Sequence, residues 1–256
     1  DTDRGKSGRM RFYGKIKYAD WDMVIVPQST FELIANSPAR EEAYKLKRID
    51  EIEHVISVLE DQQSEDSLEN NSISQKIRQL RRQVWNQKSE MALEKVKKMS
   101  EKSKQKKISN VSARIDKLLD KAVDEEQYFE DLGIDALLID EAHNYKNLNF
   151  STALGREIKG VTGTSSKKAE NVQIKIETIK EKNGGRNVVM ATGTPISNTA
   201  SELWVFMKYL MSEADMRRLG IYYFDDFVNN FGKIQTMLEF TTSGKFKANT
   251  RFAGYD

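Results

Sequence analysis

The sequence has no cysteine, few prolines and an uneven distribution of glycine. The absence of cysteine excludes disulfide bonds, thiolate metal sites and cysteine nucleophiles. None of the 3 prolines lies between Pro38 and Pro195, and none of the 14 glycines lies between Gly14 and Gly133. All-β sandwiches and barrels need turn residues roughly every 8–12 positions, so this long stretch is predicted to be mostly helical.

Long apolar runs and a strong net charge are also absent. Apolar residues make up 38% and charged residues 31% of the 256 residues, and the formal net charge is +2. No run is long enough for a membrane-spanning helix, and the first residues lack the apolar core of a signal peptide. We therefore expect a cytoplasmic protein with no membrane partner. A net charge this small does not by itself predict nucleic-acid binding.

Three short apolar runs have the pattern of buried parallel strands, at residues 23–26, 136–139 and 188–190. Each run follows a turn signal and leads into polar residues or glycine. Such runs are typical of strands that are covered on both faces of a parallel sheet. Open α/β sheets carry their chemistry at the carboxyl ends of these strands. We therefore predict an α/β fold, with a helix over residues 171–182 before the third strand.

The block between the first two predicted strands has apolar residues at helical spacing. Stripes at three- and four-residue intervals begin at Ile49, Ile73 and Ile108. Narrow stripes of this kind are typical of an antiparallel coiled coil. The polar residues 61–72 are the predicted turn. We interpret residues 39–131 as a charged helical hairpin inserted into an α/β domain of residues 1–38 and 132–256.

The two arms of this predicted hairpin carry opposite charges. Residues 41–69 contain three Lys/Arg and ten Asp/Glu, whereas residues 76–107 contain twelve and three. One interpretation is that the arms compensate each other across the coiled coil. The other is that the lysines of residues 95–107 contact nucleic-acid phosphates, which would make binding salt-dependent. These lysines are Lys95, Lys97, Lys98, Lys102, Lys104, Lys106 and Lys107.

The second predicted strand ends in a motif that can carry chemistry, because residues 140–143 read Asp-Glu-Ala-His. Nucleotide hydrolysis needs a carboxylate to hold Mg²⁺ and a second group to orient or deprotonate the attacking water. Asp140 is the candidate for the metal and Glu141 for the water. Two acids at a strand end are also common without such a role, so this motif alone is a weak signal.

A second motif follows the third predicted strand. Residues 192–198 read Thr-Gly-Thr-Pro-Ile-Ser-Asn, and Ser-Glu-Leu-Trp follows at residues 201–204. Together with the DEAH segment about fifty residues earlier, this motif resembles the superfamily 2 helicases, and within them the Swi/Snf-like DNA translocases. Residues 133–148 and 184–198 are similar to the helicase region of the helicase–DNA methylase proteins of mobile elements.

The resemblance implies a partial RecA-like lobe that uses ATP and Mg²⁺ and acts on DNA. Asp140 would coordinate the Mg²⁺ of ATP, and Glu141 would position the hydrolytic water. His143 would couple the nucleotide to DNA contacts, together with the turn formed by Thr192, Gly193 and Thr194.

The resemblance also places Ser29 and Thr30 near the DNA backbone. The family often has Gly and His at the two preceding positions, where this chain has Pro27 and Gln28. These departures leave the proposed DNA contact open.

The family's phosphate-binding loop, G-x-x-x-x-G-K-[ST], has no complete counterpart in these 256 residues. Gly5, Lys6 and Ser7 have neither the first glycine of the motif nor a strand before them. A second RecA-like lobe is not recognisable either. We therefore expect a piece of a longer helicase or translocase that is inactive alone, and whether its parent carries a methylase domain is open. The alternative is a non-catalytic module that binds DNA or a partner through the basic arm.

Overall fold

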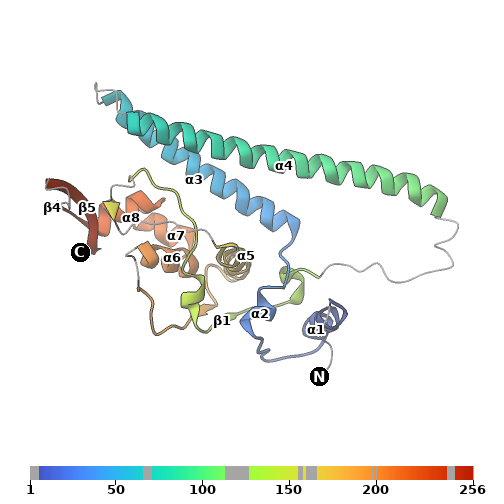
Figure 1. The fold of residues 1–256 in the computed structure, drawn as a ribbon. Helices are drawn as coiled ribbons and strands as arrows, with labels where there is room; N and C mark the ends of the chain where they lie inside the picture. The colour runs from blue at the N-terminus through green and yellow to red at the C-terminus, as the bar shows by residue number, and fades with distance from the viewer. Residues whose placement is uncertain are drawn as a thin grey trace. The chain divides into compact units, whose positions relative to one another are not determined.

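The structure is a computed structural model that describes residues 6–65, 71–112, 127–154, 158–159, 166–197, 199, 201–240 and 246–255. The chain forms two compact units. The core unit comprises Asp1–Val58 and Gln127–Asp256, and the arm unit comprises Leu59–Glu126. Helices dominate, and the strands form one small parallel pair and one three-stranded sheet (Figure 1). This mixture is consistent with the predicted α/β class.

A parallel pair of strands lies in the core unit. β1 (Leu137–Ile139) pairs with β3 (Val188–Met190), so that Ile139 lies opposite Met190. The backbone contacts continue past the strands, because Ala191 N donates to Ile139 O at 2.8 Å and Ala142 N donates to Ala191 O at 2.9 Å. The strands predicted at residues 136–139 and 188–190 are confirmed, and their carboxyl ends lie side by side.

The strand predicted at residues 23–26 is wrong. This segment has no regular secondary structure and pairs with none of the described strands, and Met23 and Ile25 are 70% and 83% exposed. It is followed by α2 (Gln28–Phe31), whose last residue, Phe31, is buried. An apolar run is a strand only where a partner pairs with its backbone groups, and the run itself does not reveal that partner.

The parallel pair is not covered on both faces, contrary to the expectation for such strands. Leu137 and Ile139 are buried, whereas Leu138 is 71% exposed and its partner Val189 is 54% exposed. One face of the pair therefore belongs to the hydrophobic core of the core unit, and the other presents apolar side chains outward.

Helices pack against the inner face of the pair. α5 (Lys167–Lys182) and α6 (Ser201–Leu210) both contact β3, and α5 also contacts the short helices η1 (Phe129–Leu132) and η2 (Ala142–Tyr145). The helix predicted over residues 171–182 is thereby confirmed, with its start four residues earlier. α7 (Glu213–Arg218) and α8 (Phe224–Phe231) follow.

Aromatic and aliphatic side chains from these helices form one core. Trp204 packs edge-on against Phe224, with ring centroids 5.9 Å apart. The rings of Trp204 and Phe227 are tilted relative to each other, and their centroids are 5.6 Å apart. α1 (Lys6–Tyr18) contacts η1, and its Tyr13 is buried in the same core. Rings packed at these separations stabilise a core beyond the area that they bury.

The second sheet lies at the carboxyl end of the chain. β4 (Gly232–Phe240) and β5 (Phe246–Tyr255) are antiparallel, and β5 also pairs in parallel with β2 (Ile158–Lys159). Gly232 is required at the junction of α8 and β4, since a Cβ atom there would lie 2.6 Å from both Val228 O and Phe252 Cε2. Sequence analysis predicted no strands in this region.

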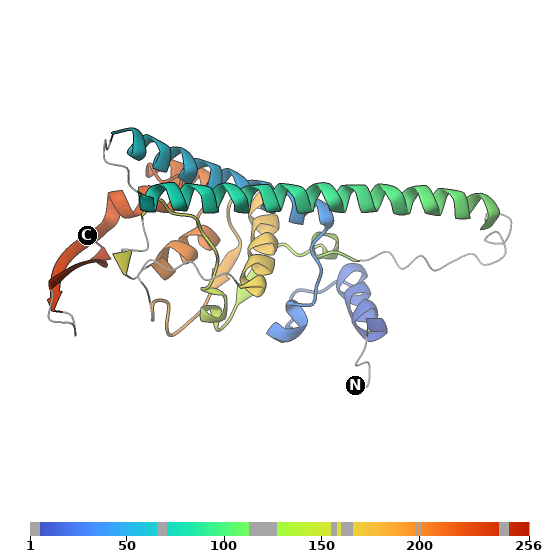
Figure 2. The ribbon, with the colours of Figure 1, turned by 45° about the horizontal axis from the view of Figure 1, so that its top comes forward.

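Two long helices correspond to the glycine-free block. α3 (Pro38–Glu65) begins in the core unit and ends in the arm unit, and α4 (Asn71–Ser112) lies in the arm unit. Figure 2 shows α4 as one uninterrupted helix. The predicted stripes are buried at Ile49, Ile52 and Leu59 of α3. Helices are thus confirmed over most of this block, while residues 113–126 of the predicted hairpin lie outside the described residues.

Within the arm unit the two helices run in opposite directions. Gln63 Nε2 donates to Ser74 Oγ at 2.7 Å, and Arg81 and Glu60 form an ion pair at 2.6 Å. The partner of the earlier α3 residue, Glu60, lies later in α4 than the partner of Gln63. The two helices are therefore antiparallel. The ion pair is exposed, so its contribution to stability is small.

In the core unit, the segment before α3 contacts η1, which follows α4 in the described part of the chain. Phe129 N donates to Ala35 O at 2.9 Å, and the rings of Phe31 and Phe129 meet edge to face with centroids 6.0 Å apart. Among the described helices, none is long and apolar enough to cross a membrane.

Candidate active site

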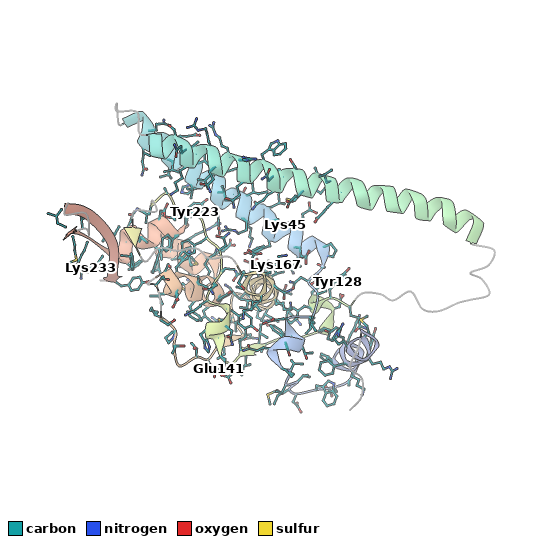
Figure 3. All side chains as sticks on the ribbon, viewed as in Figure 1. Lys45, Tyr128, Glu141, Lys167, Tyr223 and Lys233 are labelled. Atoms are coloured by element: carbon teal, nitrogen blue, oxygen red, sulfur yellow. The ribbon has the colours of Figure 1, made fainter. Side chains whose placement is uncertain are left out.

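Asp140 and Glu141 lie directly after β1, at the edge of the parallel pair. Figure 3 labels Glu141 at the end of this strand segment. Asp140 Oδ1 accepts a hydrogen bond from Glu141 N at 2.8 Å, which fixes one carboxylate oxygen against the backbone. The Glu141 side chain is 61% exposed, so its carboxylate is open to a ligand or to water.

The backbone of Glu141 has an unusual conformation. Its φ angle is 49°, in the left-handed region, which is disfavoured for residues other than glycine. The strand therefore ends in a sharp change of direction at Glu141, and the short helix η2 begins at the next residue. Strained backbone of this kind is concentrated at functional sites, where it sets the direction of a side chain.

His143 connects the acidic segment to the second motif. Its Nδ1 lies 3.2 Å from Glu141 Oε2 and 3.3 Å from Thr192 Oγ1. Thr192 Oγ1 in turn accepts a hydrogen bond from Thr194 N at 3.1 Å. The parallel pairing of β1 and β3 thus brings Asp140, Glu141 and His143 next to the hydroxyl turn, residues 192–194. This turn lies about fifty residues later in the sequence.

Gly193 lies in the middle of the hydroxyl turn and meets no steric restriction in the described structure. A Cβ atom built on Gly193 would have no heavy atom within 4 Å, apart from its chain neighbours, among the described residues. Asn198, the last residue of the predicted motif, lies outside the described residues.

A buried ion pair forms a second connection between the two motifs. Lys146 Nζ lies 3.1 Å from Glu202 Oε1, and the two side chains are 12% and 5% exposed. Glu202 Oε2 accepts a hydrogen bond from Ser197 N at 2.7 Å, and Lys146 also donates to Ser197 Oγ. The sequence does not predict this pair, because no local pattern links two residues that are 56 positions apart.

The candidate DNA-contacting residues Ser29 and Thr30 lie in α2. Ser29 is exposed and Thr30 is half-buried, and Thr30 N donates to Pro27 O at 2.9 Å. The preceding residue, Gln28, reaches the acidic segment, since its Nε2 donates to Asp140 O at 2.6 Å. The structure therefore brings α2 next to the candidate active site, although the strand expected before it does not form.

The basic stretch lies on α4 of the arm unit. Lys95 is exposed there and takes part in an interaction with other residues. The backbone of Lys97, Lys98, Lys102, Lys104, Lys106 and Lys107 is helical, and their side chains lie outside what the structure describes. The helical part of the prediction is confirmed, and phosphate contact stays a prediction.

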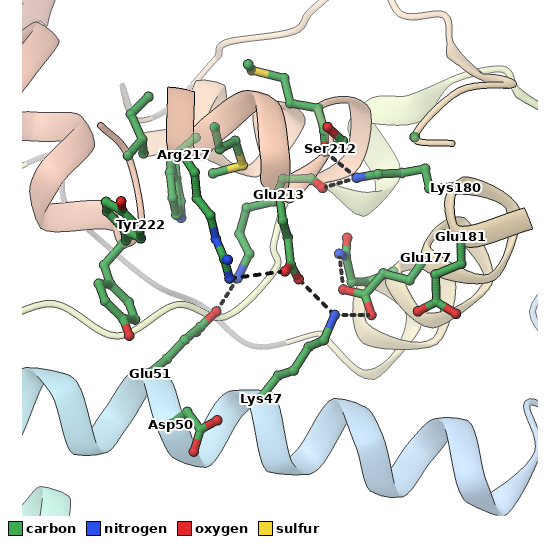
Figure 4. Close-up of a pocket in the computed structure, with 18 of the residues that line it drawn as sticks. Lys47, Asp50, Glu51, Glu177, Lys180, Glu181, Ser212, Glu213, Arg217 and Tyr222 are labelled. Carbon is green, nitrogen blue, oxygen red and sulfur yellow. Dashed lines mark hydrogen bonds and ion pairs between the residues drawn. The ribbon is translucent and has the colours of Figure 1, made fainter. Parts of the chain in front are cut away.

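Within the core unit, a cavity of about 630 Å³ lies between α3, α5, α6 and α7, away from the strand ends (Figure 4). Its charges pair with one another. Lys47 Nζ lies 2.9 Å from Glu213 Oε1 and 3.5 Å from Glu177 Oε2, and Lys208 pairs with Glu51. These contacts are typical of a structural network, because few charges in the cavity are left for a ligand.

In α5, Lys175 is buried and Lys180 is half-buried, and desolvation lowers the pKa of both. Lys180 donates to the backbone oxygens of residues 208, 209 and 211 at the end of α6, and its pKa falls to about 8. Lys175 is fully buried, with Nζ 5.4 Å from the ring centre of Phe31, and its pKa falls to about 7. The sequence does not predict the environment of either lysine, since the surrounding residues resemble an exposed helix.

Among the described residues, no group of three or more His, Asp or Glu side chains is arranged to hold a metal ion. The candidate site contributes two neighbouring carboxylates. Mg²⁺ in nucleotide sites is held by one or two carboxylates together with phosphate oxygens and water. The donor set of Asp140 and Glu141 therefore fits a metal that arrives with a nucleotide.

Two adjacent parallel strands, each followed by a polar motif at its carboxyl end, define a strand-end site of an α/β domain. The chain matches the family described as a probable helicase domain over residues 63–256, and it belongs to that family. The helicase relationship expected from the two motifs is thereby confirmed.

Defense against restriction protein B of Escherichia phage P1 is similar to part of this chain. The two are 33% identical over 133 residues, which is 50% of this chain and 6% of the phage protein. The chain therefore spans a small part of the length of this relative. No solved structure matches the chain.

Proposed function

We propose that this chain is part of the first RecA-like lobe of an ATP-dependent DNA helicase or translocase of the DEAH-box, Swi/Snf-like type. The observation that carries the proposal is the contact of His143 Nδ1 with both Glu141 and Thr192, at 3.2 and 3.3 Å. It joins an acidic strand end to a hydroxyl turn on the neighbouring parallel strand. This arrangement lets a change at the acids be transmitted to the turn.

In the proposed reaction, Asp140 and Glu141 have different tasks. Asp140 would hold the Mg²⁺ that accompanies ATP, and that ion would neutralise charge on the phosphates during transfer. Glu141 would accept a hydrogen bond from the attacking water and orient it. Its exposed carboxylate and its left-handed backbone, a conformation concentrated at functional sites, support this role.

His143 and the turn at residues 192–194 would couple the site to DNA. A proton on Nδ1 can serve the carboxylate of Glu141 or the hydroxyl oxygen of Thr192, which lie at nearly equal distances. A change in the charge near Glu141 would strengthen the hydrogen bond of Nδ1 to one of these two partners and weaken its hydrogen bond to the other. Ser29 and Thr30 would contact the DNA backbone from α2.

We further propose that the 256 residues alone do not hydrolyse ATP. They contain no complete G-x-x-x-x-G-K-[ST] motif, the backbone cradle that binds the β- and γ-phosphates in ATPases of this kind. The similarity to a far longer phage protein supports a parent chain in which other segments supply the phosphate loop and a second lobe.

The test is Mg²⁺-dependent ATP hydrolysis by the intact parent protein, with and without double-stranded DNA. We expect Glu141→Gln to lower kcat by at least about a hundredfold while ATP binding persists, because removal of the charge disables water orientation. Glu90→Gln, an exposed glutamate of α4, is the matched control. Equal turnover by wild type and Glu141→Gln would contradict the proposal.

The alternative is a non-catalytic module that binds DNA or a partner through the basic arm, and the seven lysines of residues 95–107 favour it. Replacing those lysines with glutamine tests this function. Loss of DNA binding and of its salt dependence supports the module, since each phosphate contact contributes to the salt slope. Arg78→Gln with Arg82→Gln, on the exposed surface of the same helix, is the control.

A further inference from the structure

Side-chain hydrogen bonds fasten α2 and the residue after it to the acidic strand end. Gln28 Nε2 donates to Asp140 O at 2.6 Å, and Asn144 Nδ2 donates to Gln28 Oε1 at 3.1 Å. Tyr145 Oη donates to Glu32 Oε1 at 3.3 Å. Two segments more than a hundred positions apart in the chain are thus joined at the candidate active site.

Gln28 acts on one particular peptide group. The carbonyl oxygen of Asp140 and the N–H of Glu141 belong to the same planar unit. Gln28 holds the oxygen of this unit, and the Asp140 carboxylate holds its N–H at 2.8 Å. Both ends of the peptide are therefore fixed by side chains, at the residue where φ is 49°. The orientation of this peptide sets the direction of the Glu141 side chain.

Asn144 determines how the Gln28 amide is oriented. Its Nδ2 group is a donor and needs the oxygen of the Gln28 amide, so the NH₂ group of Gln28 faces the Asp140 carbonyl. Gln28 is half-buried, whereas the next residue, Ser29, is exposed. Gln28 thus connects the first turn of α2, where Ser29 is exposed, to the peptide between Asp140 and Glu141.

We propose that Gln28 is a positioning residue that links nucleic-acid contact at Ser29 and Thr30 to the orientation of Glu141. A displacement of α2 by a bound nucleic-acid backbone moves the Gln28 amide, and with it the Asp140–Glu141 peptide. The site would then be activated only when α2 is engaged. This inference rests on the proposed function.

The test uses the intact parent protein with a Gln28→Glu substitution, which keeps the size of the side chain but removes the donor to the Asp140 carbonyl. We expect kcat at saturating DNA to fall about tenfold, the lower end of the effect of removing an outer-shell partner. The KM for ATP and the Kd for DNA should stay within about twofold, since Gln28 acts through the peptide and not on a ligand.

Rescue and charge controls accompany this variant. Gln28→His offers one donor and one acceptor in its neutral form, so it should restore at least half of the lost kcat. Asn144→Ala, which leaves the Gln28 amide without its orienting donor, should lower kcat in the same direction. Gln79→Glu, on an exposed position of α4, adds the same charge elsewhere and should change nothing.

The outcomes separate the two proposals. If wild type hydrolyses ATP and Glu141→Gln does not, but Gln28→Glu is fully active, the positioning role is overturned and the proposed function stands. A fall in DNA affinity that matches the fall in kcat overturns it too, because Gln28 then contacts DNA directly. Failure of Gln28→His to rescue has the same meaning. No turnover by wild type removes both proposals.

Discussion

Lys146 and Glu202 form an ion pair that is almost completely withdrawn from water. Their nearest charged atoms are 3.1 Å apart, and the side chains are 12% and 5% exposed. The pair joins the segment after β1 to the first turn of α6. Both oxygens of Glu202 are used, one by Lys146 and the other by the N–H of Ser197.

Removing one member of this pair should be costly. We expect Lys146→Met to destabilise the core unit by roughly 3–5 kcal/mol, because it removes the ammonium group that lies 3.1 Å from a carboxylate only 5% exposed. Adding Glu202→Gln should recover part of the loss, since glutamine still accepts from Ser197 N. Urea unfolding of Lys146→Met, Glu202→Gln and the double variant measures this, and Lys182→Met, which breaks the exposed pair with Asp135, is the control. Additive losses in the double variant would contradict the coupling.

The buried lysine Lys175 should make stability depend on pH. Burial lowers its pKa to about 7, and Glu41 and Glu32 only partly oppose this effect. The unfolded chain keeps the proton up to about pH 10.5. Between these values the unfolded state binds more protons than the folded state, so the free energy of unfolding rises with pH. Lys180, with a pKa of about 8, acts in the same direction.

Urea unfolding at pH 7, 8 and 9 tests this dependence. We expect Lys175→Met to be more stable than wild type at pH 7 and to show a flatter rise toward pH 9. The range stops at pH 9 because burial raises the pKa of Tyr44 and Tyr145, which reverses the trend above pH 10. A pH profile of Lys175→Met parallel to that of wild type would show that this lysine is not the cause.

Neighbouring residues of β1 should differ sharply in their tolerance of truncation. Ile139 is 6% exposed and Leu138 is 71% exposed. Ile139→Ala should destabilise the core unit by about 2–5 kcal/mol through lost burial and the cavity that remains. Leu138→Ala should change stability by less than about 0.5 kcal/mol. Denaturant midpoints of the two variants provide the comparison, and equal losses would mean that the outer face of the strand is covered.

The left-handed backbone at Glu141 predicts a conflict between stability and function. Glu141→Gly should stabilise the fold by about 0.5–1 kcal/mol relative to Glu141→Ala, since glycine adopts this conformation without steric strain. Both variants lack the carboxylate, so both should lose ATP turnover in the intact protein. Thermal unfolding distinguishes them, and a less stable glycine variant would show that the backbone at this position is not strained.

Local patterns were sufficient to predict the parallel strands and α5. Each apolar run lies between clear turn signals, and polar motifs follow the strands directly. The same reasoning failed at residues 23–26, where an apolar run forms no strand and Met23 and Ile25 are exposed. It also missed β4 and its antiparallel partner β5, because residues 233–238 of β4 are exposed and form no buried apolar face that would mark a strand.

The candidate site was partly predictable for the same reason. Asp140, Glu141 and Thr192 could be grouped because parallel strands place their carboxyl ends together. The contact of Gln28 with Asp140 O and the pairing of Lys146 with Glu202 could not be predicted, since they depend on tertiary packing. Glutamine and lysine are ordinary surface residues, and nothing in the neighbouring sequence marks these as buried or bridging.

The hydrogen bond between Phe129 N and Ala35 O has a consequence for how the protein folds. It closes a chain segment of about ninety residues, and closing so long a loop costs roughly 4 kcal/mol of chain entropy. The contact between Gln63 and Ser74 closes only about eleven residues and costs roughly 2 kcal/mol. We therefore expect the helical hairpin to form before Phe129 reaches Ala35, so that a slower hairpin would delay the contact between the rings of Phe31 and Phe129.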